Sequence, residues 1–69
     1  MNYIDRLEEK IIVTLKKHGA PLSSKELASR TGYHINHVRV ALKEMTRDRR
    51  LIRYVGPVYD LAADERVGT

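Results

Sequence analysis

The chain has 69 residues, of which 32% are charged and 42% hydrophobic, and this length suits one compact domain. It contains no cysteine, which excludes disulfide frameworks, thiolate zinc sites and cysteine nucleophiles. Its apolar stretches, such as residues 11–13, are far shorter than the roughly 20 residues of a membrane-spanning helix, and the N-terminus lacks the pattern of a signal peptide. We therefore expect a soluble, cytoplasmic protein.

The net charge of +4 is unevenly distributed along the chain. Residues 1–29 carry five bases and four acids, residues 30–53 carry seven bases and two acids, and residues 54–69 carry one base and three acids. The positive excess is therefore concentrated in the middle of the chain. A polyanionic partner is one reason for such a concentration, and an ordinary solvated face is the alternative.

The first segment has the pattern of an amphipathic helix of about four turns. Asn2 is a candidate N-cap, and Gly19 followed by Pro21 marks the end of the helix. The apolar residues that recur at helical spacing are Ile4, Leu7, Ile11, Ile12 and Leu15.

A second, shorter helix is expected over about residues 24–31. Ser23 and Glu26 have the spacing of a capping box, in which each side chain accepts a hydrogen bond from the other residue's backbone N–H. Gly32 then supplies the positive φ that a sharp turn requires.

A third helix is expected over about residues 34–48, and its two faces differ in character. The apolar face is expected to enter the core, while the opposite face is basic and exposed. The apolar face carries Val38, Ala41, Leu42 and Met45, and the opposite face carries Asn36, Val40, Lys43 and Arg47, with Arg39 at its flank.

After the third helix the pattern changes to period two, which predicts two short strands around Gly56-Pro57. Tyr33 is expected in the core, and Tyr54 and Tyr59 are expected to pack these strands on the helices. Residues 62–69 are expected to form a flexible tail. The predicted fold class is mainly α with a small β-hairpin.

The segment "KELASRTGYHINHVRVAL" resembles the helix-turn-helix signature, with Ala28 where two helices cross, Gly32 at the turn and Val38 packing the second helix on the first. Together with its flanks, about residues 4–61, the chain resembles the winged helix-turn-helix DNA-binding domain of small bacterial, archaeal or phage transcription regulators, including the GntR-like group. This resemblance implies a three-helix winged helix-turn-helix domain over residues 1–61 and sequence-specific binding of double-stranded DNA.

The resemblance also implies roles for individual residues. In this family the third helix enters the major groove, where polar side chains and arginine match base edges. The residues that correspond to base-contacting positions are His34, Ile35, Asn36, Arg39 and Val40. Phosphate contact is expected from Lys43, Arg47 and the helix-terminal amides near Ser24 and Lys25, and backbone or minor-groove contact from Arg53 and Tyr54 on the first wing strand.

Two positions depart from the family's usual pattern. His34 stands at a helix cap where serine or threonine is common, so we expect it to cap the helix differently or to contact a phosphate. Arg49 stands where glycine is common, which predicts either a longer last turn or an arginine in the left-handed region. Arg49 and Arg50 are expected to stabilise the end of the helix through its dipole, with phosphate contact as the alternative.

Other classes of function find little support in the sequence. His34 and His37 are spaced to share a helix face, but no further metal ligands are placed near them. There is no glycine-rich phosphate loop, paired-carboxylate site or catalytic cluster. We therefore expect neither an enzyme nor a cofactor.

Two hypotheses follow for the partner. The first is a DNA-binding transcription regulator that acts as a dimer or cooperatively, because tight specific binding usually needs two half-sites. The second is a protein-interaction module that binds a component of the transcription machinery or a repressor. In that case Ile35, Val40 and Val13 would be contact residues, and the basic face would meet an acidic partner.

Overall fold

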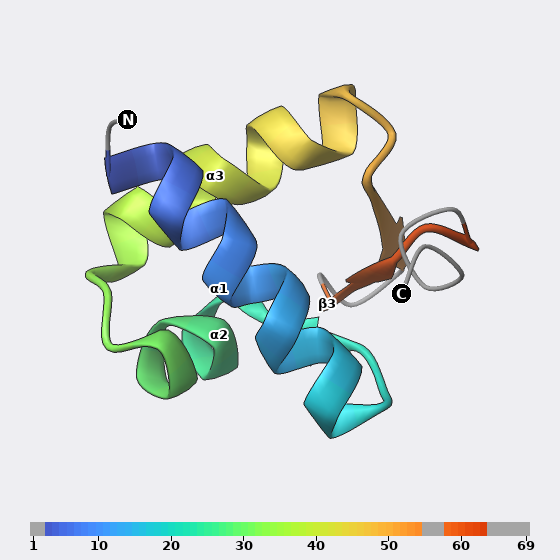
Figure 1. The fold of residues 1–69 in the computed structure, drawn as a ribbon, viewed down its shortest axis with the longest axis horizontal. Coiled ribbons are helices and arrows are strands. Elements are labelled where there is room, and N and C mark those ends of the chain that lie inside the picture. The colour runs from blue at the N-terminus through green and yellow to red at the C-terminus, as the bar shows by residue number, and fades with distance from the viewer. Residues whose placement is uncertain (1–2, 55–57, 64–69) are drawn as a thin grey trace.

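The computed structural model describes residues 3–54 and 58–63. Asn2, the turn at Gly56-Pro57 and residues 64–69 of the predicted tail lie outside the described residues. The elements are the helices α1 (Tyr3–His18), α2 (Ser24–Thr31) and α3 (Ile35–Arg47) and the strands β1 (Leu22–Ser23), β2 (Leu51–Tyr54) and β3 (Val58–Leu61) (Figure 1). The fold is mainly α with a small antiparallel sheet, as expected for the winged helix-turn-helix class. None of the described helices is long and apolar enough to cross a lipid bilayer.

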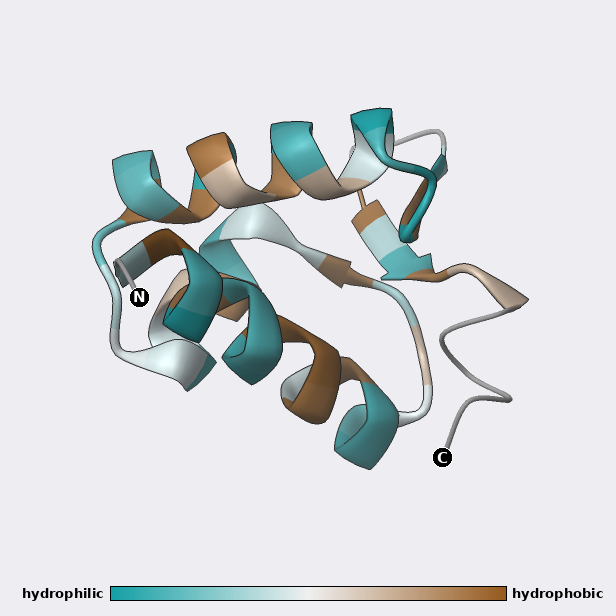
Figure 2. Ribbon diagram, turned by 45° about the horizontal axis from the view of Figure 1, so that its top comes forward, coloured by the Kyte–Doolittle hydropathy of each residue, from teal (hydrophilic) through white to brown (hydrophobic). Residues whose placement is uncertain are grey.

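The three helices and the sheet share one hydrophobic core. Each helix turns an apolar stripe inward and leaves its charged residues outside, as the alternation of colours along the ribbons shows (Figure 2). Tyr33 and Tyr59 are partly buried and pack against this core, which agrees with the expectation for both. The core residues are Leu7, Ile11, Ile12 and Leu15 of α1, Leu22 of β1, Leu27 of α2, Val38, Ala41, Leu42 and Met45 of α3, and Leu51 and Leu61 of the sheet.

The capping box predicted for α2 is present. The Ser23 Oγ accepts a hydrogen bond from the Glu26 N–H at 3.2 Å, and the Ser23 N–H donates to Glu26 Oε1 at 3.0 Å. At the other end, Gly32 has a φ of +79° and its N–H donates to the Ala28 carbonyl at 3.0 Å. These local interactions limit α2 to the predicted span and set the tight turn that leads to α3.

The end of α3 is closed by the backbone of the three residues that follow it. The Asp48 N–H donates to the Glu44 carbonyl at 2.9 Å, and the Arg50 N–H donates to the Met45 carbonyl at 2.8 Å. Arg49 has a φ of 63°, so it occupies the left-handed region, as one of the two sequence-based alternatives predicted. A residue with a Cβ is strained there, and the hydrogen bond from the Arg50 N–H to the Met45 carbonyl closes the turn around it.

The expected two-stranded hairpin is part of a three-stranded sheet in the order β1-β3-β2. Strand β1 was not predicted, because its two residues are too short to show a period of two. It pairs antiparallel with β3, with Leu22 opposite Tyr59. Since Ser23 is also the N-cap of α2, this pairing joins the start of α2 directly to the wing.

The two faces of the sheet have different environments because side chains alternate along each strand. Leu51 lies opposite Leu61 in the register, and both are buried in the core. Ile52 and Tyr54 occupy the alternate positions of β2 and are exposed, Tyr54 by 46%. The expectation that Tyr54 packs the wing on the helices is therefore wrong; Tyr59 has that role.

An ion pair connects the end of α3 to α1. Arg50 Nη1 lies 3.3 Å from Oε1 of Glu8. The side chain of Arg50 therefore reaches α1, whereas its place in the sequence predicted a role at the end of α3. Burial raises the pKa of the Glu8 carboxyl above its ordinary value, the charge of Arg50 opposes this, and the charges of Glu44, Asp5 and Asp48 raise it further. A raised pKa in the folded state means that ionised Glu8 opposes folding, and that this effect fades as the pH falls through the raised pKa.

We expect the substitution Arg50→Ala to raise the pKa of Glu8 further, because it removes the guanidinium that favours the charged carboxylate. The measurement is a pH titration of the Glu8 side-chain carboxyl resonance by NMR. Arg47→Ala is the matched control, since Arg47 is exposed and is not among the groups that shift Glu8. An unchanged or lowered pKa in Arg50→Ala would contradict the ion pair.

Candidate nucleic-acid interface

A basic cleft of about 350 Å³ lies between α3 and the sheet. Three of its described lining residues are positively charged, and they come from two consecutive elements, a helix and a strand. We call this surface the α3–wing cleft. It is lined by Arg39, Lys43 and Thr46 of α3, Arg53 of β2 and Tyr59 of β3.

Packing of the core places these side chains. Arg39 and Lys43 lie one turn apart on α3, on the side away from its buried stripe, and both are exposed. On the sheet, Arg53 is the direct cross-strand partner of Tyr59, which packs against the core. The sheet thereby brings a third cation to the same cleft as the two cations of the helix.

Three other residues that were predicted to contact DNA lie on the outer surface of α3, outside the cleft. Asn36, Val40 and Arg47 are all exposed, Val40 by 48%. Arg47 Nε lies 3.5 Å from Oδ1 of Asp48, in an ion pair whose two side chains are both open to solvent. Such exposed pairs contribute little free energy, so the pair leaves Arg47 able to exchange Asp48 for another anion.

His34 is the N-cap of α3, which resolves the question raised by the missing serine or threonine. Its Nδ1 accepts a hydrogen bond from the Asn36 N–H at 3.1 Å. Because Nδ1 is the acceptor, the neutral ring carries its proton on Nε2, which can donate to an anion outside the helix. His34 thus stabilises the first turn of α3, which contains Asn36.

His37 has a different environment from the exposed surface of α3 that carries Asn36, Val40 and Arg47. Its ring centroid lies 4.8 Å from that of Tyr3 in α1 and 6.1 Å from that of His34. Within the described part of the chain, no group of three or more histidine, cysteine or acidic residues is arranged to hold a metal ion. His37 therefore contributes to the contact between the starts of α1 and α3.

Some predicted site residues are placed less favourably. Ile35 and Ser24 are half-buried, which reduces the surface each can offer to a partner, while Lys25 is exposed. Glu26 places a carboxylate at the N-terminus of α2, where a phosphate was expected. Hydrogen bonds from the Ser23 backbone and side chain lower the pKa of Glu26, so this carboxylate is held in its charged form.

The two predicted wing residues do not lie together. Arg53 lines the α3–wing cleft, whereas Tyr54, the next residue of β2, lies on the other face of the sheet. Sequence reasoning also missed Thr46, which lies on α3 one turn after Lys43, and assigned Tyr59 a packing role alone. A helical projection that includes Thr46 beside Arg39 and Lys43 would have placed Thr46 on this surface. The position of Tyr59 in the cleft depends on the strand register, which the local sequence does not show.

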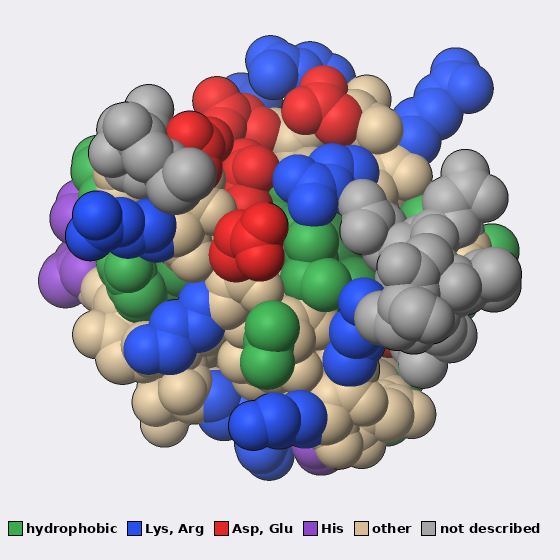
Figure 3. Space-filling view, viewed as in Figure 1, with side chains coloured by type: hydrophobic (Ala, Val, Ile, Leu, Met, Phe, Trp, Pro, Cys, Tyr) green, Lys and Arg blue, Asp and Glu red, His purple; other side chains and the backbone are tan. Residues whose placement is uncertain are grey.

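Acidic residues gather on another side of the molecule. The carboxylates that act on Glu8 are those of Asp5 in α1, Glu44 in α3 and Asp48 just after α3. Acidic side chains form a group over the α1 side of the molecule (Figure 3). No acidic residue is among the described residues that line the α3–wing cleft, so its positive charge is not cancelled locally.

Comparisons with known proteins do not assign the chain to a family. No protein-family model matches the sequence, and neither a curated protein nor a solved structure matches it.

We expect His34→Ala to destabilise the protein by about 1 kcal/mol, because it removes the acceptor at the N-terminus of α3. His34→Asn is the matched variant, since asparagine is a preferred N-cap and should retain most of the stability. Chemical denaturation measures both. Equal stability of the parent and His34→Ala would show that the His34 cap contributes nothing.

Proposed function

We propose that the protein is a sequence-specific regulator of transcription that binds double-stranded DNA through α3 and the α3–wing cleft. The observation that carries this proposal is that Arg39 and Lys43 of a helix and Arg53 of a strand line one cleft. None of the described residues that line this cleft is acidic. This cleft continues into the exposed surface of α3. The arrangement offers both a helix for base edges and cations for the sugar-phosphate backbone.

The outer surface of α3 has the chemistry needed in a major groove. The groove is about 12 Å wide and accepts an α-helix, and its base edges present hydrogen-bond donors and acceptors. Arg39 can donate two hydrogen bonds to guanine, and Asn36 can pair with adenine. Val40, which is exposed on the same surface, can contact a thymine methyl group.

The remaining charged groups suit contact with phosphates. Lys43 and Arg47 lie farther along α3, and Arg53 extends the positive surface onto the wing. Phosphate contacts position a protein on the duplex and provide salt-sensitive affinity. One domain of this size contacts few base pairs, so we further propose that tight binding uses a dimer or cooperative assembly on two half-sites.

A protein-interaction function is the second candidate, and exposed apolar residues favour it. Val40 on α3 and Ile52 and Tyr54 on β2 are all more than two-fifths exposed. A partner protein could cover these side chains while acidic groups meet the cleft. The two candidates differ in their dependence on salt, because release of counterions from DNA makes its affinity fall steeply as salt is added.

We expect the affinity for a random duplex to fall with salt at a log–log slope of about −0.9 per neutralised phosphate, and Lys43→Ala to flatten this slope by about one unit. Fluorescence anisotropy over a series of salt concentrations measures the slope. On a duplex selected from a random pool, Arg39→Ala should cost about 1 to 3 kcal/mol and relax the preference at one base position.

Arg6→Ala is the matched control, because Arg6 is an exposed base on α1 that lies outside the cleft. Arg6→Ala should change the salt slope by less than one unit and should leave the base preference unchanged. If Lys43→Ala and Arg39→Ala bind every duplex as the parent does, α3 is not the DNA-contacting helix. Selection of a palindromic duplex would support two-fold assembly.

A further inference from the structure

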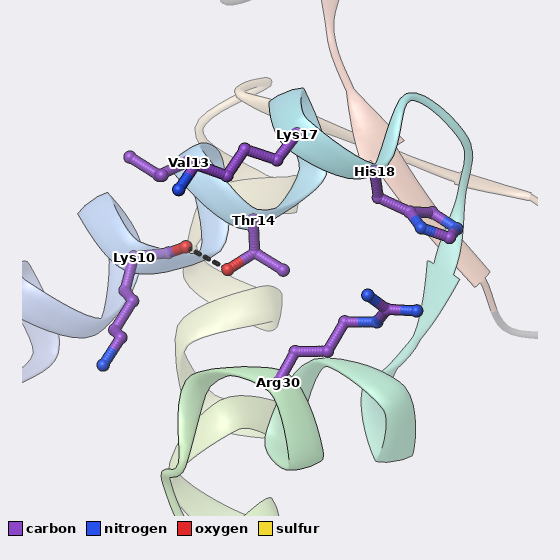
Figure 4. Close-up of a pocket in the computed structure, with 6 residues that line it drawn as sticks. All are labelled: Lys10, Val13, Thr14, Lys17, His18 and Arg30. Carbon is purple, nitrogen blue, oxygen red and sulfur yellow. Dashed lines mark hydrogen bonds between the residues drawn. The ribbon is translucent and has the colours of Figure 1, made fainter.

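A second basic hollow, of about 530 Å³, lies between α1 and α2. It has no lining residue in common with the α3–wing cleft, and none of its described lining residues is acidic. We call it the α1–α2 hollow. It is lined by Lys10, Val13, Thr14, Lys17 and His18 of α1 and by Arg30 of α2 (Figure 4).

The side chains around the α1–α2 hollow differ in how they can meet a ligand. The guanidinium of Arg30 extends from α2 toward the end of α1, where His18 lies (Figure 4). Lys10 and Lys17 stand on α1 at the rim, and Val13 is exposed between them. The hollow therefore combines a planar cation, flexible cations and a small apolar surface.

Helix dipoles explain part of this arrangement. Lys17 and His18 lie in the last turn of α1, and Arg30 lies in the last turn of α2, where positive charge is favourable. Lys10 lies in the middle of α1, away from either helix end, and its Nζ lies 6.0 Å from the centroid of the Tyr33 ring, a contact that accounts for part of its position. The dipoles thus account for three of the positions but not for the shared concave surface.

Glu26 is an acidic residue whose charge interacts with two residues of the α1–α2 hollow. Its pKa is lowered first by hydrogen bonds from Ser23 and also by the charges of Arg30 and His18, so it lies within their electrostatic reach. Its carboxylate is already held at the N-cap of α2, where it accepts from the Ser23 N–H at 3.0 Å. Glu26 therefore offsets part of the charge without filling the hollow.

We propose that the α1–α2 hollow binds a small oligophosphate, either free or as part of a nucleoside triphosphate. A guanidinium matches the geometry of a phosphate with two parallel hydrogen bonds, and lysines add point charges. Several cations around one hollow suit an anion with more than one phosphate. The volume of the hollow also lies within the range of small-molecule sites, about 300 to 1,000 Å³.

The lining also specifies how such a ligand is held. The Thr14 hydroxyl donates to the Lys10 carbonyl at 2.7 Å, so its proton is already used. The ligand is therefore held by the charged side chains, with Arg30 as the directional donor. A nucleoside group would rest on Val13, which otherwise exposes an apolar side chain to water.

The test is an NMR titration of the ¹⁵N-labelled full chain with sodium tripolyphosphate at fixed ionic strength. We expect saturable shifts of backbone amides in residues 10–18 and 28–31. Arg30→Gln should weaken the apparent affinity about tenfold, in line with the loss of a charge-assisted hydrogen bond. Lys17→Gln should also weaken it, and Arg6→Gln, which removes an exposed arginine outside the hollow, should leave it within about twofold.

The spectrum of each variant before titration shows whether it is folded. If Arg30→Gln does not fold, the affinity of Lys17→Gln for tripolyphosphate tests the proposal in its place. Shifts confined to α3 and β2, or equal weakening by Arg30→Gln and Arg6→Gln, would overturn the proposal. A parallel titration with ATP distinguishes the two forms of the ligand. Tighter binding of ATP that is lost in Val13→Ser supports the nucleoside form, and equal affinity supports the free oligophosphate.

A duplex titration of Arg30→Gln separates this proposal from DNA binding. If Arg30→Gln weakens duplex binding as much as Arg53→Gln does, the α1–α2 hollow is part of the DNA surface and the oligophosphate proposal fails. If neither variant binds duplex differently from the parent while tripolyphosphate still maps to the hollow, DNA binding through the cleft fails and the present proposal stands.

Discussion

Burial of one face of α3 is the constraint on which the rest of the structure depends. Val38, Ala41, Leu42 and Met45 are almost completely buried against the other helices and the sheet. Since successive residues of an α-helix are offset by a fixed rotation, burying these four leaves little freedom for the others. The exposed bases of α3 therefore face outward together, and any rotation of the helix would expose part of the core.

Pairing of β1 with β3 connects this helix packing to the wing. Leu22 enters the core beside α2 and lies opposite Tyr59, while Ser23 starts α2 through its capping box. The wing is thereby attached to the helices through both its backbone and its buried leucines. Arg53 consequently lies beside α3, and the three residues between α3 and β2 include Arg49 in the left-handed region.

The charges of the protein are separated into regions by the same packing. Acidic groups surround the Glu8–Arg50 pair on the α1 side, where burial makes ionisation of Glu8 less favourable. The α3–wing cleft and the α1–α2 hollow are basic and are built from different elements. Three lysine or arginine residues line each of these two concave surfaces, so much of the positive charge is concentrated there.

Local patterns in the sequence determined the three helices, the capping box of α2, the left-handed turn at Gly32 and the exposed face of α3, because these depend on residues within a few positions of one another. Tertiary structure alone decided the strand β1, the ion pair of Arg50 with Glu8, the outward position of Tyr54 and the meeting of Arg53 with Arg39 and Lys43. The physical reason is that strand register and contacts between distant elements arise from packing of the whole core. A two-residue strand or a single arginine carries no periodic signal of its partner in the local sequence.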